Sequence, residues 1–230
     1  MPVTRTIPGY DPLQPGWYGA MAQGHALSMF SRAYHKSKDG EKYFLDILNI
    51  LQPFKIKSED GGIKNTIFDN YNWYEEYPML PNGQFVLNGF MYSMVGLFDA
   101  ILACGQDKEN VNAVSCFHTA KVLFADGLSS LYQILPMFDN GFGSNYDLRH
   151  IFSQENVPPN RARWDYHFIH ITLLKFFIIN LGDESKKDLF VGEMNFSDYE
   201  VQMFKERFET VHDRWLGYMD GDFAHNNGNN

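Results

Sequence analysis

The hydrophobic positions of this chain recur mainly at the three- and four-residue spacing of α-helices. That spacing predicts helices over residues 17–36, 41–52, 85–104, 110–135 and 165–181, and a last helix that runs to about Met219. The helices over 85–104 and 165–181 are apolar nearly all round, so we expect both to be buried. Pro53 is expected to end the second helix, because proline lacks the backbone N–H that a helix interior needs.

Non-helical segments separate these helices. Residues 1–16 hold four prolines and are expected to form irregular, extended chain. Residues 63–68 follow a Gly-Gly turn and are expected to form a short strand. Ser197 lies where it can cap the last helix. We predict one domain over residues 1–219, followed by a disordered tail over residues 220–230, which are polar and glycine-rich.

A faint internal repeat organises the helices. A helix rich in small residues, a second helix, a proline and an extended piece that ends in a tyrosine segment occur twice. The matching positions are Gly24 with Gly89, Pro53 with Pro136, and Tyr77 with Tyr146. Repeated helical hairpins predict a mainly α fold, a complete or partial α/α toroid with short β-strands at the rim of a cleft. An irregular α bundle is the alternative.

Composition narrows the class of partner. The net charge of −9 disfavours a broad nucleic-acid-binding surface, whereas a local basic site remains compatible with it. Aromatic residues make up 16% of the chain, which suits a carbohydrate cleft as well as a core. No run of about 18 apolar residues is evident, and prolines interrupt the opening where a signal peptide would lie. Cys104 and Cys116 could form a disulfide, but we favour the alternative that they remain unpaired.

Three segments carry a tyrosine among charged residues: 73–78 (WYEEYP), 146–150 (YDLRH) and 163–167 (RWDYH). Pro78 disfavours the helical conformation at Tyr77, which should therefore lie on extended chain. Arginines lie three residues after Tyr146 and three residues before Tyr166, and a nearby cation lowers the pKa of a tyrosine by favouring phenolate. We expect the three segments to meet in one site.

Other polar residues in these segments have alternative explanations. Four carboxylates could exchange protons or form solvated turns: Glu75, Glu76, Asp147 and Asp165. His167 and His170 have a spacing that could hold a metal, but bonds from such histidines to neighbouring carbonyls are more common, and we predict no metal.

Five motifs occur in an order that identifies a family. They are residues 16–24 (GWYGAMAQG), 73–78 (WYEEYP), 85–90 (FVLNGF), 146–150 (YDLRH) and 162–171 (ARWDYHFIHI). Residues 2–180 thus resemble the C-terminal domain of the heparan sulfate D-glucuronyl C5-epimerases. The resemblance implies conversion of D-glucuronate to L-iduronate in heparan sulfate or heparin precursor chains. It also implies a Golgi location, upstream β-rich domains that this chain lacks and a homodimer as one assembly.

The resemblance also implies roles for individual residues. Removal of the C5 proton and its return to the opposite face of the sugar need two acid/base groups and no cofactor. The residues that match the family as proton-transfer groups are Glu76, Tyr77, Tyr146 and Tyr166. Those expected to bind the anionic polysaccharide, N-sulfated heparosan or heparan sulfate, are Arg149, Arg163, Asn88, Gln23, His150 and Trp164. The assignment of groups to ring faces stays open.

Three other functions remain compatible with these residues. A uronate polysaccharide lyase would begin with the same proton abstraction, and a non-catalytic glycosaminoglycan-binding module would keep the cleft without turnover. An inverting glycosidase would need two of the four carboxylates about 6.5–9.5 Å apart. One departure from the family lies in residues 79–84, a turn that is one residue longer here.

Overall fold

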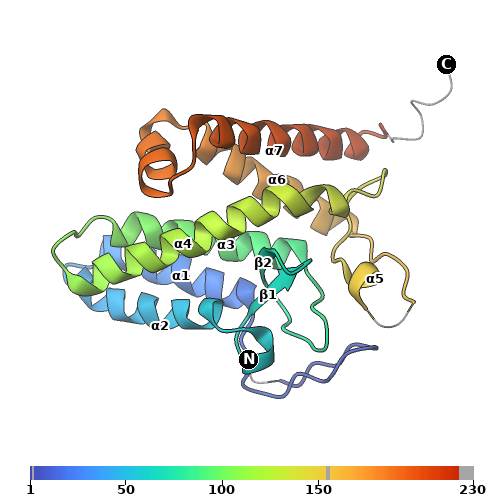
Figure 1. Cartoon of the computed structure of the whole chain (residues 1–230), viewed down its shortest axis with the longest axis horizontal. Helices are drawn as coiled ribbons and strands as arrows, with labels where there is room; N and C mark the ends of the chain where they lie inside the picture. The colour runs from blue at the N-terminus through green and yellow to red at the C-terminus, as the bar shows by residue number, and fades with distance from the viewer. Residues whose placement is uncertain (2, 154–155, 223–230) are drawn as a thin grey trace.

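Helices dominate the computed structural model, which describes residues 1, 3–153 and 156–222 (Figure 1). The α-helices are α1 (Ala20–Lys36), α2 (Tyr43–Lys55), α3 (Leu87–Cys104), α4 (Val111–Ile134), α5 (Arg149–Phe152), α6 (Trp164–Leu181) and α7 (Asp198–Met219). Strands β1 (Lys64–Ile67) and β2 (Tyr71–Tyr74) form an antiparallel hairpin. The mainly α class is confirmed, whereas the toroid stays a prediction. Most of the tail predicted to be disordered, residues 223–230, lies outside the described residues.

The helices stack in layers around α3. Helices α1 and α2 lie on one side of α3 and α4, and α6 and α7 pack together on the other side (Figure 1). Helix α1 approaches α3 so closely that a Cβ added to Gly96 would lie 2.2 Å from the carbonyl oxygen of Gly24. Glycine at both positions therefore sets the spacing of the two helices. Gly89, which the repeat matched to Gly24, instead faces the side chain of Glu76.

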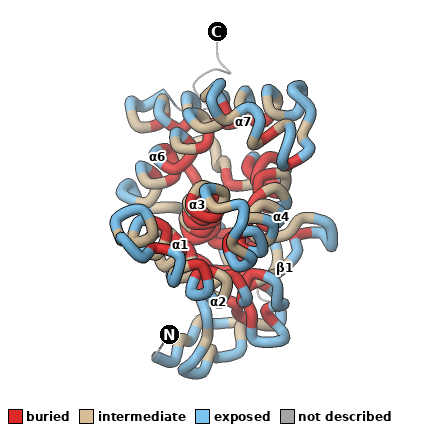
Figure 2. The backbone as a smooth tube through the Cα atoms, turned by 90° about the vertical axis from the view of Figure 1, so that its left-hand side faces the viewer, coloured by how far each residue is buried: buried red, intermediate tan, exposed pale blue. Residues whose placement is uncertain are grey.

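Helix α3 is the central buried element, as its apolar pattern predicted. Figure 2 shows it running through the buried interior of the fold. By length and composition it could cross a membrane, contrary to the expectation that no run is long enough. The core helix of a globular protein satisfies the same criterion, and 78% of this helix is buried among the other elements. Its apolar character is explained by packing.

Helix α2 corrects the expectation for Pro53. The helix continues through Pro53 to Lys55, rather than ending before it. A proline this close to the end of a helix costs little, because few hydrogen bonds of the helix remain to be lost. The Pro53 carbonyl also accepts hydrogen bonds from the backbone N–H groups of Ile56 and Ile63. These bonds connect the end of α2 to the start of the β hairpin.

Helix α7 begins as predicted. The Ser197 hydroxyl accepts a hydrogen bond from the Glu200 N–H, and the Glu200 carboxylate accepts one from the Ser197 N–H. This reciprocal pair satisfies two N–H groups that the first turn of a helix would otherwise leave unbonded. The cap fixes the point at which the chain turns to cover α6.

The two cysteines correct a second expectation. Cys104, at the end of α3, and Cys116, in α4, form a disulfide, with their Cα atoms 5.9 Å apart. Sequence spacing did not favour this pair, but the short connection between α3 and α4 returns the chain alongside itself. The disulfide therefore closes the tip of the helical hairpin.

Loss of this disulfide is expected to destabilise the fold. In the double variant Cys104→Ser, Cys116→Ser, the unfolding free energy should fall by about 2–4 kcal/mol, because the open hairpin has more conformational freedom when unfolded. Urea unfolding followed by circular dichroism measures the difference. Reduced wild type is the control and should match the double variant. Equal stability of oxidised wild type and the variant would contradict the prediction.

Candidate active site

The Glu76 carboxylate lies buried over the first turn of α3. Strand β2 leads into residues 75–78, and the Ala20 N–H donates to the Glu75 carbonyl, which holds this segment against the start of α1. A Cβ added to Gly89 would lie 2.4 Å from Glu76 Oε2. Only glycine leaves room for the carboxylate here. The N-terminal end of a helix also favours a negative charge.

Glu76, Tyr77 and Tyr146 form a chain of interacting side chains. The Tyr77 hydroxyl interacts with the Glu76 carboxylate and with the Tyr146 hydroxyl, while Glu76 Oε2 is buried without a hydrogen-bond partner among the described residues. The Tyr166 ring packs edge to face on Tyr146, with ring centroids 5.0 Å apart. The prediction that the three tyrosine segments meet is thus confirmed by their geometry. Their roles in proton transfer stay predictions.

Backbone hydrogen bonds place Tyr146. Its N–H donates to the Asn160 carbonyl at 2.7 Å, and its carbonyl accepts from the Leu87 N–H at 3.0 Å. The Leu148 N–H donates to the Gln84 carbonyl at 3.0 Å. The Tyr146 segment is therefore held between the start of α3 and the chain that leads into α6.

Two histidines of α6 anchor the same segment through Ser144. The Ser144 hydroxyl lies 2.9 Å from Nδ1 of His167 and 2.7 Å from Nδ1 of His170, and the Ser144 N–H also donates to His167 Nδ1. His167 Nε2 lies 3.0 Å from the Trp215 carbonyl. Burial lowers the pKa of both histidines, that of His170 to about 3. They thus act as neutral hydrogen-bonding groups, and no metal-binding cluster occurs among the described residues.

The pKa values in the site are set mainly by burial. Burial raises the pKa of Glu76 and raises that of Tyr77 to about 12, and the carboxylate of Glu76 adds to the second effect. The pKa of Tyr146 is raised further, by burial first and then by Glu76 and Tyr77. This reverses the expectation that Arg149 lowers it. The Arg149 guanidinium instead lies 3.4 Å from the carboxylate of buried Asp147.

Arg163 is close to Tyr166, as the spacing predicted. Its Cζ lies 5.4 Å from the centroid of the Tyr166 ring, and its guanidinium also pairs with Asp165 at 3.2 Å. Both arginine and carboxylate are exposed to solvent, as is the neighbouring Trp164, with 60% of its surface accessible. This edge of the site is open to a ligand.

The remaining predicted binding residues differ in their surroundings. Asn88 is buried, and its Oδ1 has no hydrogen-bond partner among the described residues. His150 Nδ1 is buried in the same way, and burial lowers the pKa of this histidine. Gln23 points elsewhere, since its amide donates to the Ile50 carbonyl of α2 at 3.1 Å. The binding roles of all three stay predictions.

Sequence reasoning missed Arg5. Its Cζ lies 3.6 Å above the centroid of the Tyr77 ring, and the Trp17 ring also packs against Tyr77, with centroids 5.9 Å apart. Arg5 belongs to the irregular opening segment and to none of the recognised motifs. The available signal was weak: a lone arginine among residues that are mostly uncharged.

Glu75, unlike its neighbour, has a structural role. Its buried carboxylate accepts hydrogen bonds from the Asn65 side chain at 3.3 Å and the Phe85 N–H at 3.1 Å. Burial raises its pKa to about 8. Asp147 is likewise held by Asn160, at 2.6 Å, and by Arg149. These internal bonds argue against the pair of free carboxylates that an inverting glycosidase needs.

The raised pKa of Glu75 predicts a pH-dependent stability. The folded state keeps this proton to about pH 8, whereas the unfolded state loses it near 4.5, so stability is lost as the pH rises across that window. Glu75→Gln should remove this part of the slope. Unfolding free energies of variant and wild type, measured by urea at several pH values, test it. Parallel curves between pH 4.5 and 8 would contradict the prediction.

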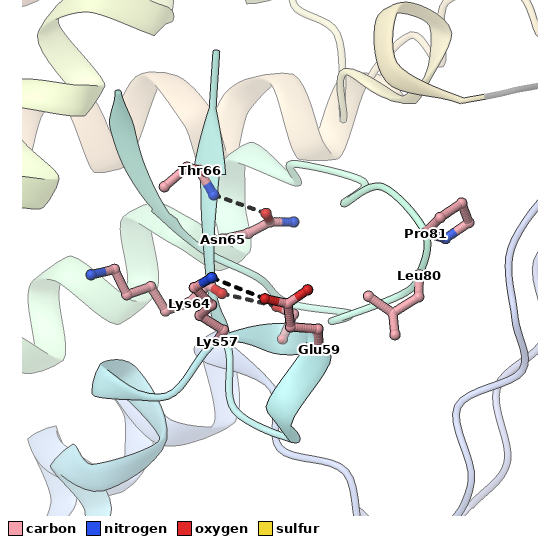
Figure 3. Close-up of a pocket in the computed structure, with 8 residues that line it drawn as sticks. Lys57, Glu59, Lys64, Asn65, Thr66, Leu80 and Pro81 are labelled. Carbon is pink, nitrogen blue, oxygen red and sulfur yellow. Dashed lines mark hydrogen bonds and ion pairs between the residues drawn. The ribbon is translucent and has the colours of Figure 1, made fainter. Parts of the chain in front are cut away.

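A pocket of about 270 Å³ lies apart from the tyrosines, against the β hairpin (Figure 3). Lys64, Asn65 and Thr66 line one wall, and the loop with Leu80 and Pro81 faces them (Figure 3). Lys57 at its edge is paired with Glu59 at 3.0 Å. Because the pocket contains none of the predicted site residues, the tyrosine cluster remains the candidate active site.

Comparison with known proteins agrees with the motifs. The family model "D-glucuronyl C5-epimerase C-terminus" matches residues 1–191. The chain is 41% identical to D-glucuronyl C5-epimerase of Caenorhabditis elegans over 94% of its own length, and 30% identical to an uncharacterized protein of Methanocaldococcus jannaschii over 75%. It spans 31% of the length of the first and 50% of the second. The chain therefore belongs to the D-glucuronyl C5-epimerase family, whose C-terminal region it matches.

Proposed function

We propose that this chain carries the acid/base site that converts D-glucuronate to L-iduronate in N-sulfated heparosan and heparan sulfate chains. The observation that carries the proposal is the chain of interacting side chains Tyr146, Tyr77 and Glu76, with the Tyr166 ring packed against Tyr146. It brings together two tyrosines, of which Tyr146 interacts through Tyr77 with a buried carboxylate. Epimerisation needs such a pair, a base and an acid.

In this proposal the two roles fall to Tyr146 and Tyr166. Tyr146 passes its proton to Tyr77 as Tyr77 passes its own to Glu76, which leaves a phenolate on Tyr146. That phenolate takes the proton from C5, and the electron pair of the C–H bond moves into the adjacent carboxylate of the sugar. Tyr166 then donates its hydroxyl proton to the opposite face of C5. Exchange of protons with water restores the starting state.

Positive charges at the site suit an anionic substrate. Arg163 lies beside the Tyr166 ring, where its exposed guanidinium can bind a sulfate. Arg149 binds the carboxylate of the uronate in this scheme, with Asn88 and His150 at the sugar hydroxyls. The hydrogen leaves and returns as a proton, so the scheme needs no redox cofactor.

Membership of the family supports a cellular setting for the proposal. We place it in the Golgi lumen, joined there to β-rich domains that complete the substrate cleft, with a homodimer as one assembly. The Cys104–Cys116 disulfide supports the location, because disulfides persist in the secretory pathway and are rare in the cytosol. Asn195-Phe196-Ser197 also has the form of a glycosylation acceptor, but the Ser197 hydroxyl is engaged in the cap of α7.

Proton exchange at C5 tests the proposal. The protein, joined to the β-rich domains of its family, is incubated with N-sulfated heparosan in deuterated water. Deuterium at C5 together with iduronate is the expected result. An unsaturated uronate that absorbs in the ultraviolet would indicate a lyase instead. Binding of the polysaccharide without deuterium incorporation would indicate a non-catalytic module.

A further inference from the structure

Arg5 makes an unusual contact for a residue of an irregular segment. Its guanidinium lies over Tyr77 with Cζ 3.6 Å from the ring centroid, inside the range of a cation–π interaction. Its Nε is buried and has no hydrogen-bond partner among the described residues. A charged group is costly to bury in this way unless an opposite charge compensates it.

The opening segment holds Arg5 in place by hydrogen bonds. The N–H and carbonyl of Arg5 bond to the carbonyl and N–H of Leu13, at 3.1 and 3.0 Å. The Trp17 indole donates to the Val3 carbonyl at 2.9 Å, and the Asp11 N–H donates to the Leu80 carbonyl at 2.9 Å. The segment is therefore a wall of the site, and the position of Arg5 does not depend on its own side chain.

The buried carboxylate of Glu76, next to Tyr77 in the chain, is the negative charge on which Arg5 acts, because the guanidinium lowers the pKa of Glu76. The charged and titratable groups around Glu76 and Tyr77 are Glu75 on the same segment, Tyr146 on the segment before α5, Tyr166 on α6 and Arg5 on the opening segment. Within the described residues, the positive charge that acts on both Glu76 and Tyr77 is that of Arg5. The charge of Arg5 lowers the pKa of both groups, whereas burial raises both values and the Glu76 carboxylate raises that of Tyr77.

We propose that Arg5 is a positioning residue of the proton-transfer site, which keeps the Glu76–Tyr77–Tyr146 chain anionic by placing its guanidinium on the Tyr77 ring. The proposal rests on the proposed function, because an anionic chain is what allows Tyr146 to accept the C5 proton. Arg5 acts through Tyr77 and Glu76 and does not touch the reacting carbon. This role depends more on the positive charge of Arg5 than on the shape of its side chain.

The coupling can be measured without any substrate. The chain with ¹³C-labelled glutamate is titrated by NMR, and the Glu76 signal is assigned by its absence in Glu76→Gln. In Arg5→Met the pKa of Glu76 should rise above its wild-type value, because burial is then unopposed by a cation. Arg5→Lys should restore most of the wild-type titration. Arg32→Met removes an exposed arginine of α1 and should leave the titration unchanged. An unchanged Glu76 titration in Arg5→Met would overturn the proposal.

The pH profile of exchange adds a second readout. In the protein joined to its β-rich domains, Arg5→Met should lower kcat/KM for C5 deuterium exchange about tenfold at neutral pH and recover as the pH rises. In Arg5→Lys, kcat/KM for the exchange should fall by a smaller factor. A loss that is equal at all pH values would overturn the electrostatic role and assign Arg5 to packing. Absence of exchange in wild type would reject the proposed function, while the NMR titration would still decide the role of Arg5.

Discussion

Replacement of Tyr166 by phenylalanine is expected to slow C5 exchange by about 10²–10⁴-fold, the usual loss when an acid/base group is removed. Tyr166 lies at the start of α6, with Arg163 beside its ring and the Tyr146 ring packed edge to face on it. Phenylalanine preserves these ring contacts but has no proton to exchange. The substitution therefore changes the chemistry of the site and leaves its shape.

The measurement is deuterium incorporation at C5 in the protein joined to its β-rich domains, with substrate binding determined in parallel. Binding and the circular dichroism spectrum should stay close to those of wild type. Tyr199→Phe, at an exposed position in α7, is the matched control and should exchange at the wild-type rate. Near-normal exchange in Tyr166→Phe would make this residue a packing residue and leave both ring faces to Glu76, Tyr77 and Tyr146.

Glu76→Gln is expected to have an effect of similar size. Glutamine keeps the size and polarity of the side chain, but its amide cannot take the proton that Tyr77 releases in the proposed scheme. The phenolate on Tyr146 then cannot form by this route, so exchange should fall by about 10²–10⁴-fold with little change in binding. Glutamine has nearly the same volume, which preserves the close contact with Gly89.

The adjacent carboxylate supplies the control. Glu75→Gln makes the same chemical change one residue earlier, at a side chain that bonds Asn65 and Phe85 and is not part of the tyrosine chain. It should alter the pH dependence of stability and spare the exchange rate at neutral pH. If both variants lost activity equally, the loss in Glu76→Gln would reflect local structure, and the relay through Glu76 would be rejected.

Elements whose signal is local were predictable from the sequence. The spacing of apolar residues predicted the bounds of α1, α3, α4 and α6 to within a few residues, because this spacing reflects which face of a helix is buried. Ser197 marked the start of α7, since a cap depends on neighbouring residues alone. Pro78 kept Tyr77 out of a helix for the same reason.

Features that depend on tertiary contacts were not predictable in this way. Arg5 reaches Tyr77 only because the opening segment folds back, and Arg149 turns to Asp147 because that carboxylate is buried. The disulfide needed the return of α4 along α3. The gathering of three tyrosine segments was anticipated from their shared composition, but the order Tyr146–Tyr77–Glu76 followed only from the structure.

The backbone bonds of Tyr146 have a consequence for biosynthesis. The backbone of Tyr146 is hydrogen-bonded to Leu87, which is synthesised before it, and to Asn160, which is synthesised after it. A chain emerging from the ribosome can assemble helices α1 to α4 first, since domains form as their contacts become available. The proposed acid/base site cannot be completed until the chain that leads into α6 has emerged and docked. We therefore expect a nascent protein that stalls between α4 and α6 to be folded in its first layers but to lack the complete site.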